Sequence, residues 1–182
     1  MSCSMLQFAE RSETETPECK RAMNHEAYRS GIAELYAAEV LGEALASRWL
    51  ELSSSPEQKF KLALFLQLES EAKVRLRPLL ARHGLDLVED QGQRSAGIAV
   101  AEKFAAVPWK DAMATFADLA RPYLERFQAL LTVATPEDLP LVSFMVAHEA
   151  AIIRIAKREA AGEGSMDSEL LPMLAYPLVR RS

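Results

Sequence analysis

The sequence contains only two cysteines in 182 residues, Cys3 and Cys19, and both stand near its beginning. Two such cysteines cannot build the disulfide framework that stabilises small secreted domains, so we expect a reducing, cytoplasmic setting. Positive charge is also scarce, because 21 Lys and Arg stand against 26 Asp and Glu and leave a net charge of −5. Binding to a phosphate backbone needs a basic face, so no nucleic-acid partner is expected.

Further absences exclude other classes. No uninterrupted apolar run approaches the roughly 20 residues that span a bilayer, and residues 1–20 lack the basic and apolar regions of a signal peptide. We therefore expect no membrane partner. The sequence also lacks a glycine-rich phosphate loop, a Cys-x-x-Cys pair and a Ser/His/Asp set. Nucleophilic catalysis consequently has no support from the motifs.

Helical periodicity is what the sequence has in abundance. Apolar residues recur with a 3.6-residue period, and no strand-like alternation competes with it. A chain of 182 residues fits one domain with a sizeable core. The pattern predicts an all-α fold with four long helices, over residues 24–52, 56–83, 108–133 and 136–162.

The predicted helix ends carry capping signals. Ser55 and Thr135 each precede a proline and stand three residues before Gln or Asp, as in a capping box. Gly84 and Gly162 stand where C′ glycines end helices. Pro122 is expected to kink or break the third helix.

Short loops after the first and third helices predict two antiparallel hairpins, joined by a link over residues 84–107. Within that link, RSAGIAVAEKFAA is a candidate for a short helix. The predicted organisation is an N-terminal arm (1–23), a helical bundle (24–164) and an apolar tail (165–182) that packs on the bundle or on a partner. A homodimer is the expected oligomer.

Carboxylates interrupt the apolar stripes at matching depths. Glu39 and Glu69 each lie about fifteen residues from the first loop, and Glu149 lies about as far beyond the second loop. At about 1.5 Å of rise per residue, all three are about 22 Å from a turn. The sequence therefore predicts that three glutamates meet at one level of the bundle core.

This arrangement resembles the ferritin-like superfamily, whose four-helix bundles hold two iron or manganese ions. Those sites take one Glu from each of two helices and a Glu-x-x-His motif from each of the other two. The resemblance implies that Glu39 is a single Glu, and that Glu69 and Glu149 begin the two motifs. The sequence departs from the family pattern at Ala72 and Ile152, which replace the histidines. The third helix offers no matching carboxylate on its apolar stripe.

Glu43 and His148, which lie near these glutamates, are candidates to replace the missing metal ligands. Glu43 lies one turn beyond Glu39, and an all-oxygen cluster of four glutamates suits Mg²⁺, Ca²⁺ or Mn²⁺. His148 adjoins Glu149 but points about 100° away on an ideal helix, so it joins only if the helix is rotated. The candidate metal ligands are therefore Glu39, Glu43, Glu69, His148 and Glu149.

Several interpretations stay open. The leading one is a ferritin-like protein with a degenerate carboxylate site that binds a metal, iron or manganese, or a small polar molecule. A second is a di-iron or di-manganese oxidase or oxygenase with atypical ligands. A third is a metal-free, homodimeric interaction module, in which Glu69 pairs with Lys73, and Glu149 with Lys73, Arg75 or Arg154. A heme-oxygenase-like helical fold is a further structural alternative.

Overall fold

The computed structural model describes residues 17–164 and 166–177, with side chains from residue 25 onward. This part of the chain is all-helical and contains no strand, which confirms the predicted fold class at the level of secondary structure. Its elements are α1 (Pro17–Leu52), α2 (Pro56–Arg82), α3 (Gln91–Ala105), α4 (Trp109–Leu131), α5 (Leu139–Ala161), α6 (Met166–Leu170) and the 3-10 helix η1 (Leu171–Met173).

Two helix starts differ from the prediction. Helix α1 begins at Pro17, so the last part of the predicted arm (1–23) is helical, while residues 1–16 lie outside the described residues. Helix α5 begins at Leu139, three residues late, because residues 136–138 form a turn. Thr135 Oγ1 accepts a hydrogen bond from the Asp138 backbone N–H at 3.2 Å and so caps that turn.

The other predicted boundaries hold. The Ser55 side chain accepts a hydrogen bond from the backbone N–H of Gln58, with proline at the first helical position. Gly162 ends α5 in the left-handed region, with φ of 82°, where a glycine avoids the strain that a side chain would add. Helix α4 continues through Pro122 and does not break there.

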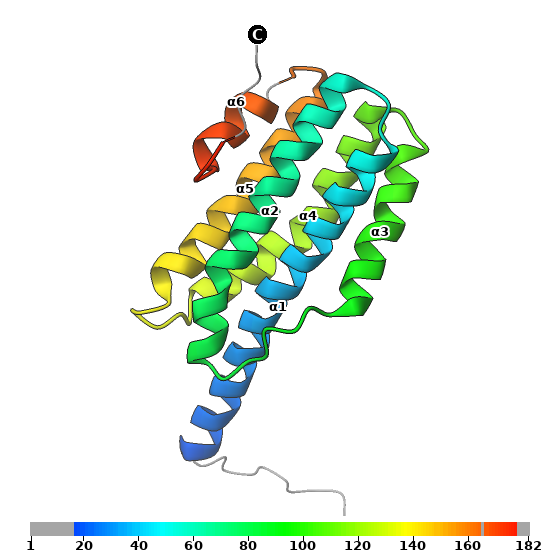
Figure 1. Ribbon diagram of the computed structural model, residues 1–182. Coiled ribbons are helices and arrows are strands. Elements are labelled where there is room, and N and C mark those ends of the chain that lie inside the picture. Colours follow the sequence, from blue (N-terminus) through cyan, green and yellow to red (C-terminus); the bar gives the residue numbers. More distant parts are fainter. Residues whose placement is uncertain (1–16, 165, 178–182) are drawn as a thin grey trace, which may run out of the picture.

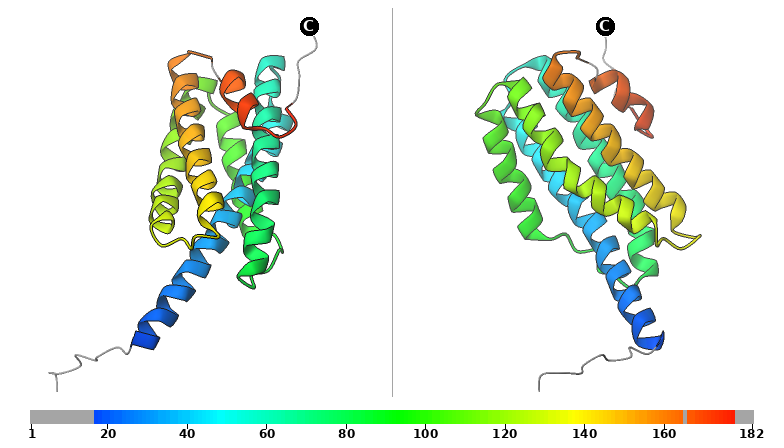
Figure 2. Two further views of the ribbon diagram at one scale, coloured as in Figure 1. Left: turned by 90° about the vertical axis from the view of Figure 1, so that its left-hand side faces the viewer. Right: turned by 180° about the vertical axis from the view of Figure 1, so that it is seen from behind.

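The long helices lie side by side (Figure 1). Helices α1 and α2 form one antiparallel hairpin, and α4 and α5 form the other. Helix α3 runs along α1 on the side away from α5, an arrangement that the views of Figure 2 also show. It contacts α1 extensively and α4 only slightly.

Helix α3 forms where the sequence suggested a short helix within the link, and it begins three residues earlier than the RSAGIAVAEKFAA stretch. Asp90 caps it by accepting a hydrogen bond from the Gly92 backbone N–H at 2.6 Å. At Gly97, an added Cβ would lie 2.3 Å from the Leu41 carbonyl oxygen, so the two helix backbones approach more closely than any side chain allows. The link between the hairpins is therefore a packed helix, held against α1 by this glycine.

Apolar side chains form two buried clusters along the length of the helices. The first includes Trp49 and Phe65, together with the tail residues Met166 and Leu170. The second lies toward the opposite end of α1 and includes Ile32, Leu35, Leu79 and Phe127. The described part of the predicted tail thus packs on the chain's own helices, against α2 and α5.

A buried aspartate joins three helices at one end of the structure. Asp138 accepts hydrogen bonds from Tyr28 Oη at 3.0 Å and from Arg82 Nη2 at 2.8 Å, and His83 Nε2 lies 2.8 Å away. These contacts connect the start of α5 to α1 and to the end of α2. Because every contact is to a donor, the buried negative charge is compensated.

A buried glutamate likewise connects several helices at the other end of the structure. Glu159 accepts hydrogen bonds from Lys61 Nζ at 2.9 Å, from Trp109 Nε1 at 3.0 Å and from the Met166 backbone N–H at 3.0 Å. It thereby connects α5 to α2, α4 and α6. Both ends of the structure are held by a carboxylate with three donors.

By length and composition, α5 is the one helix in the described residues that qualifies as a candidate membrane span. Half of the stretch that meets this criterion is buried against the rest of the protein. The buried core helix of a soluble protein meets the same criterion. The helix also carries the buried polar residues His148, Glu149 and Glu159.

We expect Asp138→Asn to destabilise the protein in a pH-dependent manner. Burial opposes ionisation of Asp138, but hydrogen bonds from Arg82 and His83 outweigh it and lower its pKa from 3.8 to about 2. This stabilisation is full above about pH 5 and is lost as the pH falls toward 2, because the unfolded chain takes up the proton near pH 3.8 while the folded state stays ionised. Chemical unfolding should show a loss of about 2 kcal/mol at pH 7 that disappears near pH 2.

Asp118→Asn is the matched control, because Asp118 pairs with Arg121 on the exposed face of α4. An equal loss in both variants, or a loss in Asp138→Asn that persists at pH 2, would contradict the assigned role.

Candidate metal centre

Four of the five candidate ligands meet in the interior, between the two apolar clusters. Glu39 comes from α1, Glu69 from α2, and His148 and Glu149 from α5, and none is more than 7% exposed. His148 Nε2 lies 3.5 Å from Glu39 Oε2 and 3.4 Å from Glu69 Oε1. One ligand atom each from Glu39, His148 and Glu149 lies within 4.8 Å of the others.

His148 reaches the cluster although it neighbours Glu149 in sequence. Side chains 100° apart on a helix both reach a point that lies between their directions. Helix α5 is turned so that this point faces α1 and α2, with His148 fully buried and Glu149 beside it. Helix α5 is therefore rotated in the way that allows His148 to join the cluster, a possibility that the sequence left open.

Apart from the approach of His148 Nε2 to Glu39 and Glu69, the polar atoms of this cluster have no well-formed hydrogen bonds. Both Glu39 carboxylate oxygens, Glu69 Oε1 and both His148 ring nitrogens are buried with no hydrogen-bond partner in the structure. Among the described residues, no ion pair to a lysine or arginine is found for Glu39, Glu69 or Glu149. A buried, uncompensated charge is strongly destabilising, so these carboxylates need protons or a cation.

The pKa values of the cluster residues also reflect the cost of burying several charges close together. Burial, together with the charges of Glu69 and Glu149, raises the pKa of Glu39 well above its usual value. Burial also raises the pKa of Glu149 from 4.5 to about 7, against the lowering influence of His148. For His148, burial lowers the pKa, but the adjacent carboxylates of Glu69 and Glu149 outweigh it and the net shift is upward.

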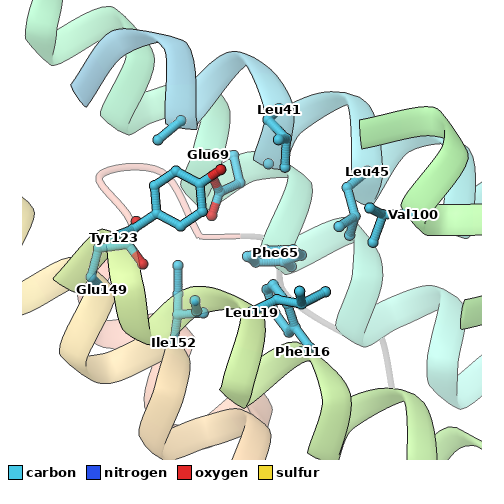
Figure 3. Close-up of a pocket in the computed structure, with 13 residues that line it drawn as sticks. Leu41, Leu45, Phe65, Glu69, Val100, Phe116, Leu119, Tyr123, Glu149 and Ile152 are labelled. Carbon is cyan, nitrogen blue, oxygen red and sulfur yellow. The ribbon is translucent and has the colours of Figure 1, made fainter. Parts of the chain in front are cut away.

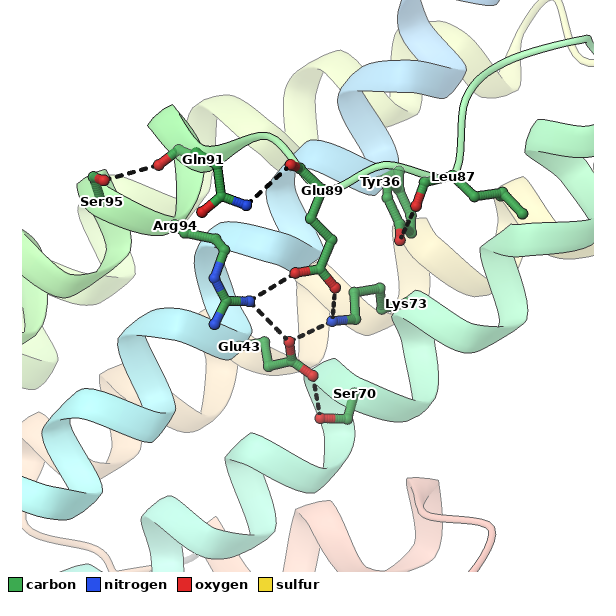
Figure 4. A network of polar contacts seen from close by, with 9 residues as sticks. All are labelled: Tyr36, Glu43, Ser70, Lys73, Leu87, Glu89, Gln91, Arg94 and Ser95. Carbon is green, nitrogen blue, oxygen red and sulfur yellow. Dashed lines mark hydrogen bonds and ion pairs between the residues drawn. The ribbon is translucent and has the colours of Figure 1, made fainter.

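Glu43 lies apart from this cluster. It forms an ion pair with Lys73 and accepts a hydrogen bond from Ser70 Oγ at 2.6 Å (Figure 4). Lys73 also contacts Glu89, which in turn pairs with Arg94. Lys73, the partner considered for Glu69 and Glu149, is thus engaged by other carboxylates, and Glu43 has its charge compensated at the surface of the hairpin.

The two other residues considered as ion-pair partners of Glu149 also have contacts elsewhere. Arg154 pairs with Glu169 at 2.6 Å, and Arg75 lies over the Phe144 ring at 4.5 Å. Ala72 and Ile152, which replace the histidines of the ferritin-like pattern, are buried in the apolar clusters.

An apolar cavity of about 120 Å³ adjoins the cluster (Figure 3). Glu69, Glu149 and Tyr123 lie at one end, and Phe65, Phe116 and Leu119 at the other. Helix α4 supplies no carboxylate here and lines the cavity instead. The sequence could not reveal this cavity, because Phe116, Leu119 and Tyr123 have the same helical spacing as ordinary core residues.

A glycine makes room for one of the ligands. At Gly42 on α1, an added Cβ would lie 2.1 Å from Glu69 Oε2 and 2.7 Å from Glu69 Cδ. The carboxylate of Glu69 therefore occupies the space that a side chain at position 42 would fill. This role of Gly42 follows only from the facing helix.

Comparisons of the chain with models of known families, with curated proteins and with solved structures find no match. The resemblance to the ferritin-like superfamily therefore stays a prediction, carried by the order of the helices and the position of the glutamates.

We expect Gly42→Ala to destabilise the protein, although alanine is favoured over glycine by about 1 kcal/mol within a helix. The new methyl group would displace the Glu69 carboxylate. In a Glu69→Ala background the same substitution should be stabilising, because the obstructing side chain is gone. Thermal unfolding of both single variants and the double variant measures this coupling. Equal effects of Gly42→Ala in the two backgrounds would refute the assignment.

We also expect Glu149→Gln to stabilise chelator-treated protein at high pH. The folded state holds the Glu149 proton up to about pH 7, whereas the unfolded chain releases it near 4.5. The wild-type carboxyl therefore lowers stability increasingly between these pH values and fully above them, by on the order of 3 kcal/mol. Urea unfolding should show little difference between variant and wild type at pH 4.5 and the full gain at pH 8.

Glu125→Gln, an exposed position on α4, is the control and should show no such pH dependence. A gain in Glu149→Gln that does not change with pH would contradict the raised pKa.

Proposed function

We propose that this chain is a metal-binding protein with a ferritin-like four-helix bundle, in which Glu39, Glu69, His148 and Glu149 hold iron or manganese. The bundle would consist of the two hairpins α1–α2 and α4–α5, with the crossover link carrying α3. The observation that carries the proposal is the set of buried carboxylate and imidazole atoms without hydrogen-bond partners.

The donor set fits such an ion. Three carboxylates and one imidazole combine ligands preferred by manganese with a ligand preferred by iron. A divalent cation would compensate the negative charges that no described lysine or arginine pairs with, and one ring nitrogen of His148 would be available to bind it. Without a metal, the same carboxylates would have to hold protons in the interior, as the raised pKa values of Glu39 and Glu149 allow.

The roles of the individual residues follow from their positions. Glu39 and His148 are fully buried and would hold the ion on the side away from the cavity. Glu69 and Glu149 line the cavity and would present the ion to a bound molecule. When bound, iron or manganese supplies redox chemistry or Lewis-acid activation.

An oxidase or oxygenase is the second candidate, and the apolar cavity beside the ligands is the observation that favours it. A storage or structural ion would need no such space. Homodimerisation and a cytoplasmic location stay predictions from the sequence.

The test is metal content by mass spectrometry, after loading untagged protein anaerobically with Fe²⁺ or Mn²⁺. We expect stoichiometric metal in the wild type and its loss in the double variant Glu39→Gln, Glu149→Gln, because two of the ligands are removed. Glu43→Gln is the matched control: it removes a carboxylate one turn from Glu39 but outside the cluster, and it should retain the metal.

Wild-type protein that is helical by circular dichroism and holds neither ion after loading would refute the proposal. Loss of metal in Glu43→Gln would instead restore Glu43 to the ligand set.

A further inference from the structure

The cavity beside the cluster has the features of a binding pocket for a small molecule. It lies among α1, α2, α3, α4 and α5, and its walls are mostly aliphatic and aromatic side chains (Figure 3). Leu119, which lines it, is about half exposed, so the cavity reaches the surface beside α4. A ligand can therefore enter without unfolding a helix.

The volume limits the size of the occupant. The cavity measures about 120 Å³. An apolar cavity of about 150 Å³ in another protein holds a benzene molecule. The enclosed space therefore fits a molecule, or part of a molecule, of about one aromatic ring.

The polar end of the cavity limits the chemistry of the occupant. Glu69 and Glu149 are the acidic residues that line it, and Glu69 Oε1 is buried without a hydrogen-bond partner. Carboxylates accept hydrogen bonds and repel anions, so the occupant needs a donor and must not carry a negative charge. A divalent ion would compensate two of the three carboxylate charges of the cluster, so the remaining charge disfavours an anion but gives a cation little advantage over a neutral donor.

We propose that this cavity binds an uncharged, single-ring-sized apolar molecule with one hydroxyl or amine donor directed at Glu69 and Glu149. This inference deepens the proposed function and rests on it in one respect: the cavity is taken as the substrate pocket of the metal centre. Occupancy of the cavity itself is measured independently of the metal.

The experiment is a calorimetric titration of the protein, before and after metal loading, with phenol, benzene, benzoate and benzylammonium. We expect phenol to bind most tightly, benzene more weakly because it lacks a donor, and benzoate not at all. Ala120 is buried and lines the cavity, so Ala120→Leu should fill it and weaken phenol binding by about tenfold or more. Ala129→Leu, on the exposed face of the same helix, is the control and should bind phenol normally.

The outcomes separate this inference from the metal proposal. Phenol binding that Ala120→Leu abolishes, with metal content unchanged, supports both. Phenol binding with the same sensitivity in a chain that takes up no metal supports the pocket and refutes the metal centre. Metal-loaded protein that binds neither phenol nor benzene overturns the pocket, and so does tighter binding of benzoate or benzylammonium than of phenol.

Discussion

The rest of the structure is arranged around carboxylates that have been removed from water. Glu39, Glu69 and Glu149 lie in the middle of the helices, between two apolar clusters, where a charge without a partner is strongly destabilising. Helices α1, α2 and α5 contribute these side chains. The packing of these helices brings the three side chains and His148 into contact.

The two ends of the structure show how this chain compensates a buried acid when charge balance is the only need. Asp138 has three polar partners at one end, and Glu159 has three at the other. The central cluster has a histidine but no lysine or arginine among the described residues, and its buried atoms lack hydrogen bonds. This contrast within one molecule is the basis of the proposed metal site.

The residues around the cluster leave space for the Glu69 side chain and for a cavity beside it. Gly42 leaves the space that the Glu69 carboxylate occupies, and Gly97 allows α3 to lie directly against α1. Helix α4 contributes apolar walls where the ferritin-like pattern has a further carboxylate, and a cavity results. The helix that departs from the predicted ferritin-like pattern is therefore one that lines the pocket.

The sequence by itself determined the all-α class, most helix boundaries and the common depth of Glu39, Glu69 and Glu149, because periodicity, capping and rise per residue are local properties. Only the tertiary structure decided that His148 joins these glutamates and that Glu43 turns to Lys73. Those choices depend on the rotation of α5 and the position of Lys73 on the facing helix. Helical spacing places a residue on a face but does not specify which face meets which neighbour. The cavity and the role of Gly42 were inaccessible for the same reason, since both are formed by residues from several helices.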